Sequence, residues 1–334
     1  MTPGVGSRVA RIASLLLGGA LLAWLLVSSG MPSILADLAR IGPGLAVILA
    51  LELTIDAFNT LGWWFTIPVA ERAGTYGWLY WVRSAGTALN EATPLASVGG
   101  EAAKLVILRR RITSAAAAAS LLAARMSFSS AKAMFIVVGM AAVWPRLALP
   151  RDVSLALLSG FVLVVIGIAM FAVLQVRGIG MGTVSALGRA RIPARWIALV
   201  DGWLHGVDAH LRDFYRARPG DLARSMVAYV CGFACGALQI LLMLGWLGLP
   251  VDPAAAVGIE AFATLIGFLM FVVPGSLGVQ EGGKVLIFAA LGLPRSAAMA
   301  VGITFRLISI IEIAMGLVAF VLLQQGKRGQ HGAR

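Results

Sequence analysis

Long apolar stretches recur along this 334-residue sequence, and each could cross a lipid bilayer as a helix. A crossing needs roughly 20 consecutive apolar residues. The chain is 60% hydrophobic and 13% charged, whereas soluble domains are about 45–50% apolar and about 25% charged. These proportions exclude the soluble, disordered and fibrous classes. We predict an all-α polytopic membrane protein, with residues 1–334 as a single integral-membrane domain and about six transmembrane helices, at 12–30, 44–67, 113–144, 153–175, 224–248 and 297–323.

The net charge of +12 is better explained by membrane loops than by nucleic acid. Lys and Arg gather on cytoplasmic loops and near anionic headgroups, and no basic stripe interleaves with aromatic residues on a soluble element. Cys231 and Cys235 have no second cysteine pair, and the histidines are dispersed. Phosphate loops, zinc-ligand spacings and nucleophile elbows are missing from the sequence. We therefore expect no nucleic-acid partner, no metal site and no cofactor.

Two further segments, 75–111 and 254–294, are apolar but interrupted near their centres by Pro, Gly and charge. Both contain Pro-x6-Glu-x2-Lys followed by four apolar residues, and the two motifs are 180 residues apart. An arginine follows each motif, at Arg125 and Arg306. We interpret this pattern as an internal duplication. The first repeat spans 44–144 with a re-entrant helical hairpin at 75–111, and the second spans 224–323 with a hairpin at 254–294.

The distribution of basic residues predicts on which side of the membrane each loop lies. With two re-entrant hairpins, most of the 27 Lys and Arg residues lie on the side of the N-terminus, and loops on the opposite side carry Arg40, Arg146, Arg151 and Arg295. The positive-inside rule then places both termini in the cytoplasm. The hairpins open to opposite sides, so the repeat is inverted. Residues 176–222 form a cytoplasmic segment with a helical apolar stripe, which is typical of an interfacial amphipathic helix.

The interrupted segments are the candidate functional regions. Non-helical backbone at membrane depth is tolerated where protein or a water-filled cavity satisfies its polar groups, and inverted repeats with broken helices are the plan of many transporters. Helix N-termini that begin at such turns attract anions. We predict hairpin turns at Pro94, Gly99, Gly100, Pro274, Gly275 and Gly278.

Charged side chains at the predicted membrane depth should face one another or a polar cavity. The basic ones are Arg83, Lys104, Arg125, Lys132, Lys284 and Arg306, and the acidic ones are Glu52, Asp56, Glu91, Glu101, Glu260, Glu281 and Glu312. In the functional interpretation, Glu101 and Glu281 pair with Arg125 and Arg306, while the two motif lysines offer charge to an anionic headgroup. In the alternative, all of these charges form structural ion pairs, or the lysines snorkel to an interface.

The candidate substrate-binding residues are therefore Lys104, Lys284, Arg125, Arg306, Glu101, Glu281, Asn90, Ser97, Ser276 and Gln280. Glu52 and Asp56 share one helical face with Asn59. This stripe either packs the helix or carries protons. Tryptophans near the predicted interfaces are expected to form an interfacial belt; these are Trp24, Trp63, Trp64, Trp78, Trp81 and Trp144.

Two stretches carry a resemblance to a known family. Residues 81–111, with Asn90, Pro94 and Gly99-Gly100-Glu101, and residues 260–306, with Pro-Gly-Ser-Leu-Gly-Val-Gln-Glu-Gly-Gly and Arg306, resemble the flippase-like membrane region of bacterial lysylphosphatidylglycerol synthases. They are most similar to the branch of hopanoid-biosynthesis-associated membrane proteins. The resemblance implies a bacterial inner-membrane protein that moves a polar-headed lipid between leaflets. In the synthases a C-terminal domain attaches the amino acid, and we expect that activity to be missing from a chain that stops at Arg334.

The sequence thus predicts a lipid translocase for a phospholipid or hopanoid-related lipid, with a midplane cavity between the two hairpins. The expected partners are membrane lipids with an anionic or polar headgroup, which would engage Lys104 and Lys284. Two alternatives stay open. One is an integral-membrane transferase that modifies a headgroup with Glu101 or Glu281 as general base. The other is a non-catalytic membrane partner of envelope-lipid enzymes.

Overall fold

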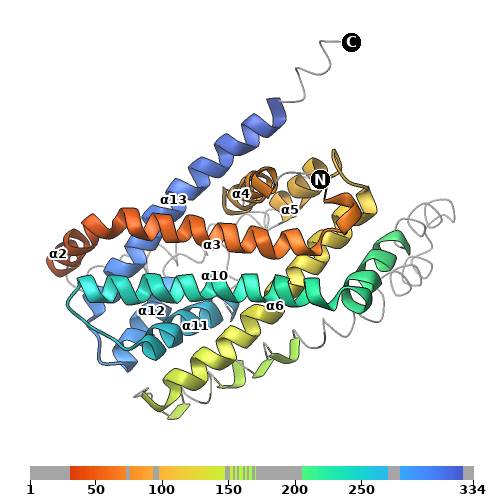
Figure 1. The fold of residues 1–334 in the computed structure, drawn as a ribbon. Helices are drawn as coiled ribbons and strands as arrows, with labels where there is room; N and C mark the ends of the chain where they lie inside the picture. The colour runs from red at the N-terminus through yellow and green to blue at the C-terminus, as the bar shows by residue number, and fades with distance from the viewer. Residues whose placement is uncertain are drawn as a thin grey trace, which may run out of the picture. The chain divides into compact units, whose positions relative to one another are not determined.

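The computed structural model describes residues 31–72, 76–92, 98–146, 205–269 and 279–325, together with parts of 151–170. Within these residues every regular element is helical (Figure 1), which confirms the all-α class. The predicted span at 12–30 lies outside the described residues, and the span at 153–175 is described only in part. The predicted turn and binding residues Pro94, Ser97, Pro274, Gly275, Ser276 and Gly278 also lie outside them.

Four helices are long and apolar enough to cross a membrane. They are α3 (Leu45–Thr66), α6 (Ser114–Val143), α10 (Pro219–Trp246) and α13 (Arg295–Gln325), and they coincide with four of the six predicted spans. Their ends follow from local chemistry. Pro219 opens α10, where a missing N–H costs nothing. After α10, Gly248 has φ +72 and Leu249 N donates to Leu244 O at 2.9 Å, which is a glycine-dependent helix stop.

Two pairs of short helices correspond to the predicted hairpins. The first helix pair is α4 (Tyr76–Ala92) and α5 (Val98–Leu108), and the second is α11 (Pro253–Leu269) and α12 (Val279–Ala290). In each pair the two helices pack against each other (Figure 1). They contain 11 to 17 residues each, fewer than the roughly 20 that a crossing needs. Shorter elements are α2 (Met31–Ile41), η1 (Gly42–Gly44), η2 (Val69–Glu71), η3 (Trp144–Arg146) and the π-helical η4 (Asp213–Ala217).

The chain divides into two compact units. Unit 1 comprises Met1–Ile55, Lys132–Val164 and Phe233–Ile311, and unit 2 comprises Asp56–Ala131, Val165–Gly232 and Glu312–Arg334. The second helix pair belongs to unit 1 and the first to unit 2, and each long helix contributes residues to both. The predicted repeats 44–144 and 224–323 stay a prediction.

Unit 1 is held together by aromatic contacts and one buried amide. Phe135 of α6 stacks on Phe233 of α10 with ring centroids 5.2 Å apart. Gln239 of α10 is 1% exposed, and its side-chain amide donates to Ile48 O at 3.0 Å and to Glu52 Oε2 at 2.9 Å. A buried amide with two acceptors on α3 stabilises the contact between α3 and α10 because neither polar group is left unsatisfied.

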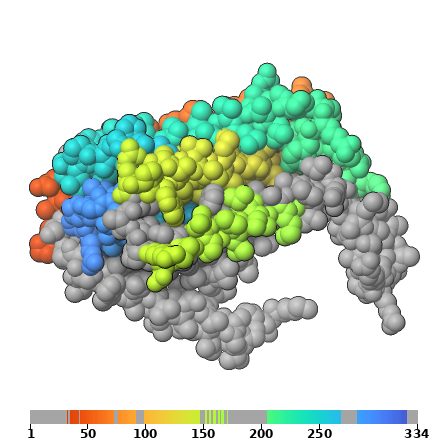
Figure 2. Space-filling view, turned by 90° about the horizontal axis from the view of Figure 1, so that it is seen from below, coloured from red at the N-terminus to blue at the C-terminus, as the bar shows by residue number. Residues whose placement is uncertain are grey.

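Unit 2 has a larger apolar core, which the first helix pair shares with α3 and α6. Its buried members are Trp63, Ile67, Leu79, Val82, Ile107, Leu108, Ala117 and Ala124. Helix α10 joins α3 through a hydrogen bond from Ser225 Oγ to Gly62 O at 2.8 Å. It joins α6 through an edge-to-face contact of Phe128 and Tyr229, with centroids 5.2 Å apart. In Figure 2 the yellow α6 lies beside the green part of α10.

The C-terminal part of the predicted interfacial segment packs on protein. Val207, Leu211 and Phe214 are each at most 2% exposed, and they pack against alanines of α6. The alanine-rich run at 115–119 permits this close contact because its side chains are small. Residues 176–204 of the predicted interfacial segment 176–222 lie outside the described residues.

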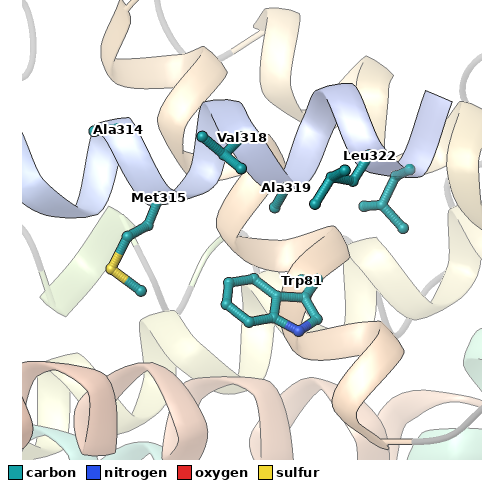
Figure 3. Close-up of a pocket in the computed structure, with 7 residues that line it drawn as sticks. Trp81, Ala314, Met315, Val318, Ala319 and Leu322 are labelled. Carbon is teal, nitrogen blue, oxygen red and sulfur yellow. The ribbon is translucent and has the colours of Figure 1, made fainter. Parts of the chain in front are cut away.

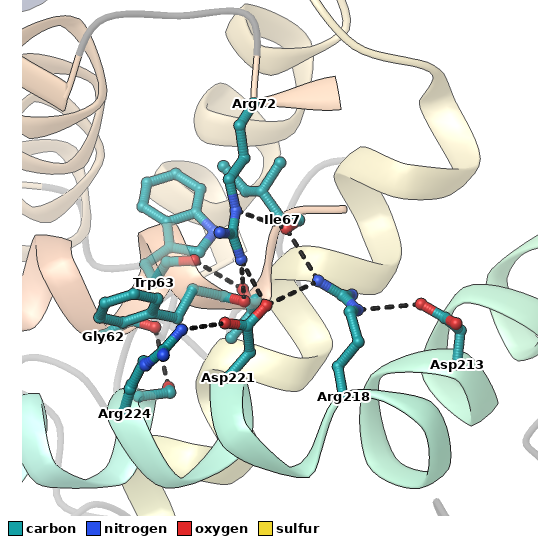
Figure 4. Close-up of polar contacts among 11 residues, drawn as sticks. Gly62, Trp63, Ile67, Arg72, Asp213, Arg218, Asp221 and Arg224 are labelled. Atoms are coloured by element: carbon teal, nitrogen blue, oxygen red, sulfur yellow. Dashed lines mark hydrogen bonds and ion pairs between the residues drawn. The ribbon is translucent and has the colours of Figure 1, made fainter. Parts of the chain in front are cut away.

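Three arginines surround Asp221 in the first turn of α10 (Figure 4). Arg72 Nη2 lies 2.7 Å from Asp221 Oδ2, and Arg218 and Arg224 each approach the same carboxylate at 3.4 Å. Arg72 also donates to the carbonyls of Phe65 and Ile67 at the end of α3. This cluster therefore caps α3 and ties it to the start of α10.

We expect Asp221→Asn to lower the free energy of unfolding by about 1–3 kcal/mol, the range for hydrogen bonds to charged groups. The substitution removes the only charge that balances Arg72 within the network, although Arg72 keeps its two carbonyl acceptors. Unfolding in mixed detergent micelles, followed by circular dichroism, measures the change. Asp213→Asn is the matched control because the Asp213 side chain is 50% exposed, against 9% for Asp221. Equal losses in both variants would contradict the network's role.

Candidate functional site

A polar cavity of about 210 Å³ lies within unit 2. Residues from five helices line it: α3, α4, α5, α6 and α10. Its lining residues are Asn59, Trp63, Arg83, Thr87, Asn90, Glu101, Lys104, Leu121, Ala124, Arg125, Phe128 and Tyr229. Four of the predicted binding residues are in this set: Asn90, Glu101, Lys104 and Arg125.

Helical periodicity explains how the lining residues reach the cavity. On α4, Arg83, Thr87 and Asn90 are spaced by four and three residues, so they share one face of the helix. On α3, Asn59 and Trp63 are four residues apart and continue the polar stripe that begins at Glu52 and Asp56. A single stripe on each helix therefore supplies polar groups to the cavity.

Two glycines allow α4 and α5 to approach closely beside the cavity. A Cβ at Gly100 would collide with Gly86 O and with the Asn90 side chain, and a Cβ at Gly86 would collide with the Lys104 stem. Gly100 N donates to Asn90 Oδ1 at 2.7 Å. Asn90 thus satisfies one of the unpaired N–H groups at the start of α5. The predicted anion site at this helix N-terminus is therefore partly taken by the protein's own side chain.

Gly100→Ala should destabilise the chain by about 1–3 kcal/mol, as overpacking does in close contacts. The new methyl group would push α5 away from the Gly86 carbonyl, which is a rigid backbone atom. Gly77→Ala is the control, because nothing lies within 4 Å of a Cβ at Gly77 on the same helix pair. Gly77 lies in the first turn of α4, so this change is expected to leave stability nearly unchanged, because the advantage of Ala over Gly applies to helix interiors. If thermal unfolding in detergent showed Gly100→Ala to be more stable than Gly77→Ala, the close approach of α4 and α5 would be contradicted.

The charges in the cavity are paired differently from the prediction. Lys104 Nζ lies 2.8 Å from Glu101 Oε1, so Glu101 pairs with Lys104 and the predicted pair with Arg125 is not made. The reason is local: residues three apart on one helix share a face, whereas Arg125 is on α6. Lys104 also sits 5.9 Å above the Trp63 ring. Arg83 forms an ion pair with Asp56 of α3.

Among the described residues, Arg125 is the cation of the cavity that has no anionic partner. It lines the cavity and is exposed, and it makes no hydrogen bond or ion pair with the part of the chain that the structure describes. Because Lys104 is balanced by Glu101 and Arg83 by Asp56, the cavity carries one positive charge in excess. The buried indole N–H of Trp63 also has no acceptor among the described residues. The cavity thus offers a guanidinium to an anionic group.

A second, much smaller pocket of about 20 Å³ lies on another side of α4 within unit 2. It is lined by the acids Asp56, Glu91 and Glu312, with Ser84, Thr87, Ala88 and Ile313. Thr87 also lines the polar cavity. Asp56 pairs with Arg83, which favours the structural interpretation of this carboxylate over a proton-carrying one.

The corresponding residues of the second motif belong to unit 1. Lys284 Nζ lies 4.6 Å above the ring of Phe305, so both motif lysines lie over an aromatic ring. Glu52 accepts a hydrogen bond from the side-chain amide of Gln239. Arg306 is partly buried in α13, while Gln280 and Glu281 lie in the first turn of α12. The polar cavity contains Lys104 and does not include Lys284.

Several lining residues were missed by sequence reasoning. Trp63 was expected in an interfacial belt, yet it is 3% exposed in the core of unit 2 beneath Lys104. The sequence did indicate this position, because Trp63 lies four residues after Asn59 and continues the helical face of Glu52, Asp56 and Asn59. Thr87 had a signal too, because it lies four residues after Arg83 and three before Asn90 on the same face of α4. Tyr229 is the one lining residue that helical spacing could not indicate, since the described residues of α10 contribute no other side chain to the lining.

Comparison with known protein families gives one match. The family model described as lysylphosphatidylglycerol synthase TM region matches residues 11–316, nearly the whole chain. No curated protein and no solved structure matches the sequence.

Proposed function

The chain belongs to the family of the lysylphosphatidylglycerol synthase transmembrane region, and we propose that it is a lipid translocase that moves an anionic lipid between membrane leaflets. It is a multi-pass membrane protein with four long apolar helices in its described part. The observation that carries the proposal is the polar cavity of unit 2, in which Arg125 has no anionic partner among the residues that the structure describes.

The cavity's chemistry fits a phosphate or another anionic group of a lipid headgroup. Arg125 supplies a planar guanidinium, the side chain that best matches phosphate geometry. Lys104, which also lines the cavity, can exchange Glu101 for the ligand without losing a charged partner. The headgroup would enter the cavity while the acyl or polycyclic tail stays in the surrounding lipid. The lipid is a phospholipid or a hopanoid-related lipid.

The proposed architecture adds the features that transport requires. Two helix pairs too short to cross act as re-entrant hairpins, inverted relative to each other, within six crossings. Both termini lie in the cytoplasm, and the membrane is the bacterial inner membrane. Rocking of the two repeats would then expose the headgroup site to each leaflet in turn, as in other transporters with inverted repeats. The repeated Glu-x-x-Lys motif and the short helix lengths support this arrangement.

Leaflet exchange in proteoliposomes tests the proposal. Liposomes of total bacterial polar lipid, with and without the protein, are treated with membrane-impermeant reagents that modify headgroups, and the modified fraction of each lipid class is measured over time. We expect one anionic class to become fully accessible only when the protein is present. If no class moves with correctly inserted protein and an applied proton gradient, the proposal is wrong. A lipid of new mass would instead indicate a transferase.

A further inference from the structure

An apolar groove of about 520 Å³ lies within unit 2, between α4 and α13 (Figure 3). Its lining is entirely apolar apart from one indole N–H: Trp81, Ala314, Met315, Val318, Ala319, Leu322 and Leu323. Figure 3 shows the Trp81 indole facing Met315, Ala319 and Leu322 of α13. The side chains remain open to the outside, since Val318 is 59% exposed and Leu322 is 61% exposed. Large exposed apolar patches of this kind mark interaction sites.

The groove lies beside a point where the two helices touch. A Cβ at Gly316 would collide with Ser84 O and the Ala88 side chain, so α13 lies directly on α4 at this point. Trp81 stands one turn before Ser84 on α4, and the lining residues Val318 to Leu323 follow Gly316 on α13. Ala314 and Met315 precede Gly316, so the residues that line this apolar slot lie on both sides of the contact along α13.

This groove is distinct from the polar cavity. Trp81 and Arg83 are two residues apart on α4, which places them on roughly opposite sides of a helix with 3.6 residues per turn. Arg83 lines the polar cavity, whereas Trp81 lines the groove. The groove and the polar cavity are therefore lined by different faces of α4.

Arginines stand at one end of the groove. Arg110 Nη1 donates to Leu323 O at 2.8 Å, and Leu323 is the last lining residue. Arg111 lies over the ring of Trp78 with its guanidinium carbon 4.3 Å from the centroid, and Trp78 is one turn from Trp81. Arg109, Arg110 and Arg111 are all exposed. An arginine has five N–H donors, so Arg110 keeps donors beyond the one that it uses on Leu323.

We propose that this groove binds one acyl chain of an anionic phospholipid from the surrounding bilayer, with the lipid phosphate at Arg110 and Arg111. The apolar slot matches a hydrocarbon chain, and the basic end matches the charge of the headgroup that the same molecule carries. Such a lipid covers the exposed side of α13 and joins its C-terminal half to α4. The site does not depend on translocation, and a failure of either proposal leaves the other standing.

Fluorescence quenching by brominated lipids tests this site. The full-length protein is placed in phosphatidylcholine nanodiscs that contain a small fraction of phospholipid brominated on its acyl chains, with either a phosphatidylglycerol or a phosphatidylcholine headgroup. The chain has nine tryptophans, so the signal of Trp81 is taken as the difference between wild type and Trp81→Phe. We expect brominated phosphatidylglycerol to quench Trp81 at a concentration at least fivefold lower than brominated phosphatidylcholine, since each basic residue near a membrane surface is worth about fivefold in anionic-lipid binding.

Two kinds of variant test separately how the basic end and the apolar slot contribute to lipid binding. Arg110→Gln/Arg111→Gln should abolish the preference for phosphatidylglycerol, while Ala314→Phe should fill the slot and reduce quenching by both lipids. Ala141→Phe, the same change at an exposed position of α6 outside the groove lining, should leave quenching unchanged. Equal quenching by the two headgroups in the wild type would reduce the groove to ordinary lipid contact and overturn the proposal. No quenching by either lipid would also overturn it, because the groove would then be covered by protein, such as a second copy of the chain.

Discussion

Replacing Arg125 with glutamine is expected to slow the leaflet exchange of the anionic lipid about 10- to 100-fold, the equivalent of one lost hydrogen-bonded charge contact. Arg125 is the cavity cation without an anionic partner among the described residues, so its loss removes the excess positive charge. The fold should be little affected, because the side chain makes no hydrogen bond or ion pair with described residues. Initial exchange rates in proteoliposomes at matched protein content measure the effect.

A matched variant makes this result specific. Arg295→Gln removes one positive charge from an exposed position at the start of α13, outside the lining of the cavity, and it should exchange lipid at the wild-type rate. Arg125→Lys should retain part of the activity, since it keeps the charge and loses the planar fork. If Arg125→Gln and Arg295→Gln were equally active, the cavity cation would have no part in transport.

Asp56→Asn is expected to lower the free energy of unfolding by about 3–5 kcal/mol, the usual cost of removing one partner from a buried ion pair. Arg83 would be left as an uncompensated charge, and its side chain is only 18% exposed. The pair joins α3 to α4 and lies beside the polar cavity, so the variant should also yield less folded protein. Size-exclusion profiles and unfolding midpoints in detergent measure both effects.

The surface pair of Arg146 and Asp252 provides the control for Asp56. Its atoms are 3.2 Å apart, but the side chains are 45% and 49% exposed, and exposed pairs are worth about 0–1 kcal/mol. Asp252 also accepts a hydrogen bond from Ala255 N at the start of α11, which asparagine can accept as well. Asp252→Asn should therefore leave the unfolding midpoint nearly unchanged. An Asp56→Asn protein as stable as Asp252→Asn would show that Asp56 is dispensable for the fold, and the proton-carrying interpretation of this residue would gain weight.

The long helices could be predicted from the sequence because membrane crossing imposes a strong, local pattern. Apolar stretches at 44–67 and 224–248 became α3 (Leu45–Thr66) and α10 (Pro219–Trp246) with small changes at their ends. The interruptions by Pro and Gly in 75–111 and 254–294 predicted two re-entrant helical hairpins. The described parts of these segments form two pairs of short helices, and their re-entrant course stays a prediction. Glycine at 86 and 100 was needed for a close helix contact that periodicity does not reveal.

The polar partners could be predicted only in part, because they depend on which helices meet. The sequence indicated that charges at membrane depth would pair, and the Arg83–Asp56 pair agrees with this. It did not identify the partner of Glu101, which is Lys104 on the same helix. The cavity also includes Tyr229, which comes from a helix more than 100 residues further along the chain. Contacts of this kind are set by packing and leave no pattern in a single sequence.

Leaflet exchange of two lipids that differ only in headgroup charge tests the central claim most directly. Phosphatidylglycerol and phosphatidylcholine with identical acyl chains are compared in the same proteoliposomes, for the wild type, for Lys104→Gln/Arg125→Gln and for Arg295→Gln. We predict faster exchange of phosphatidylglycerol by the wild type and by Arg295→Gln, and no difference between the lipids for the double variant. Equal exchange of both lipids by the wild type, or an unchanged preference in the double variant, would contradict a headgroup site at the polar cavity.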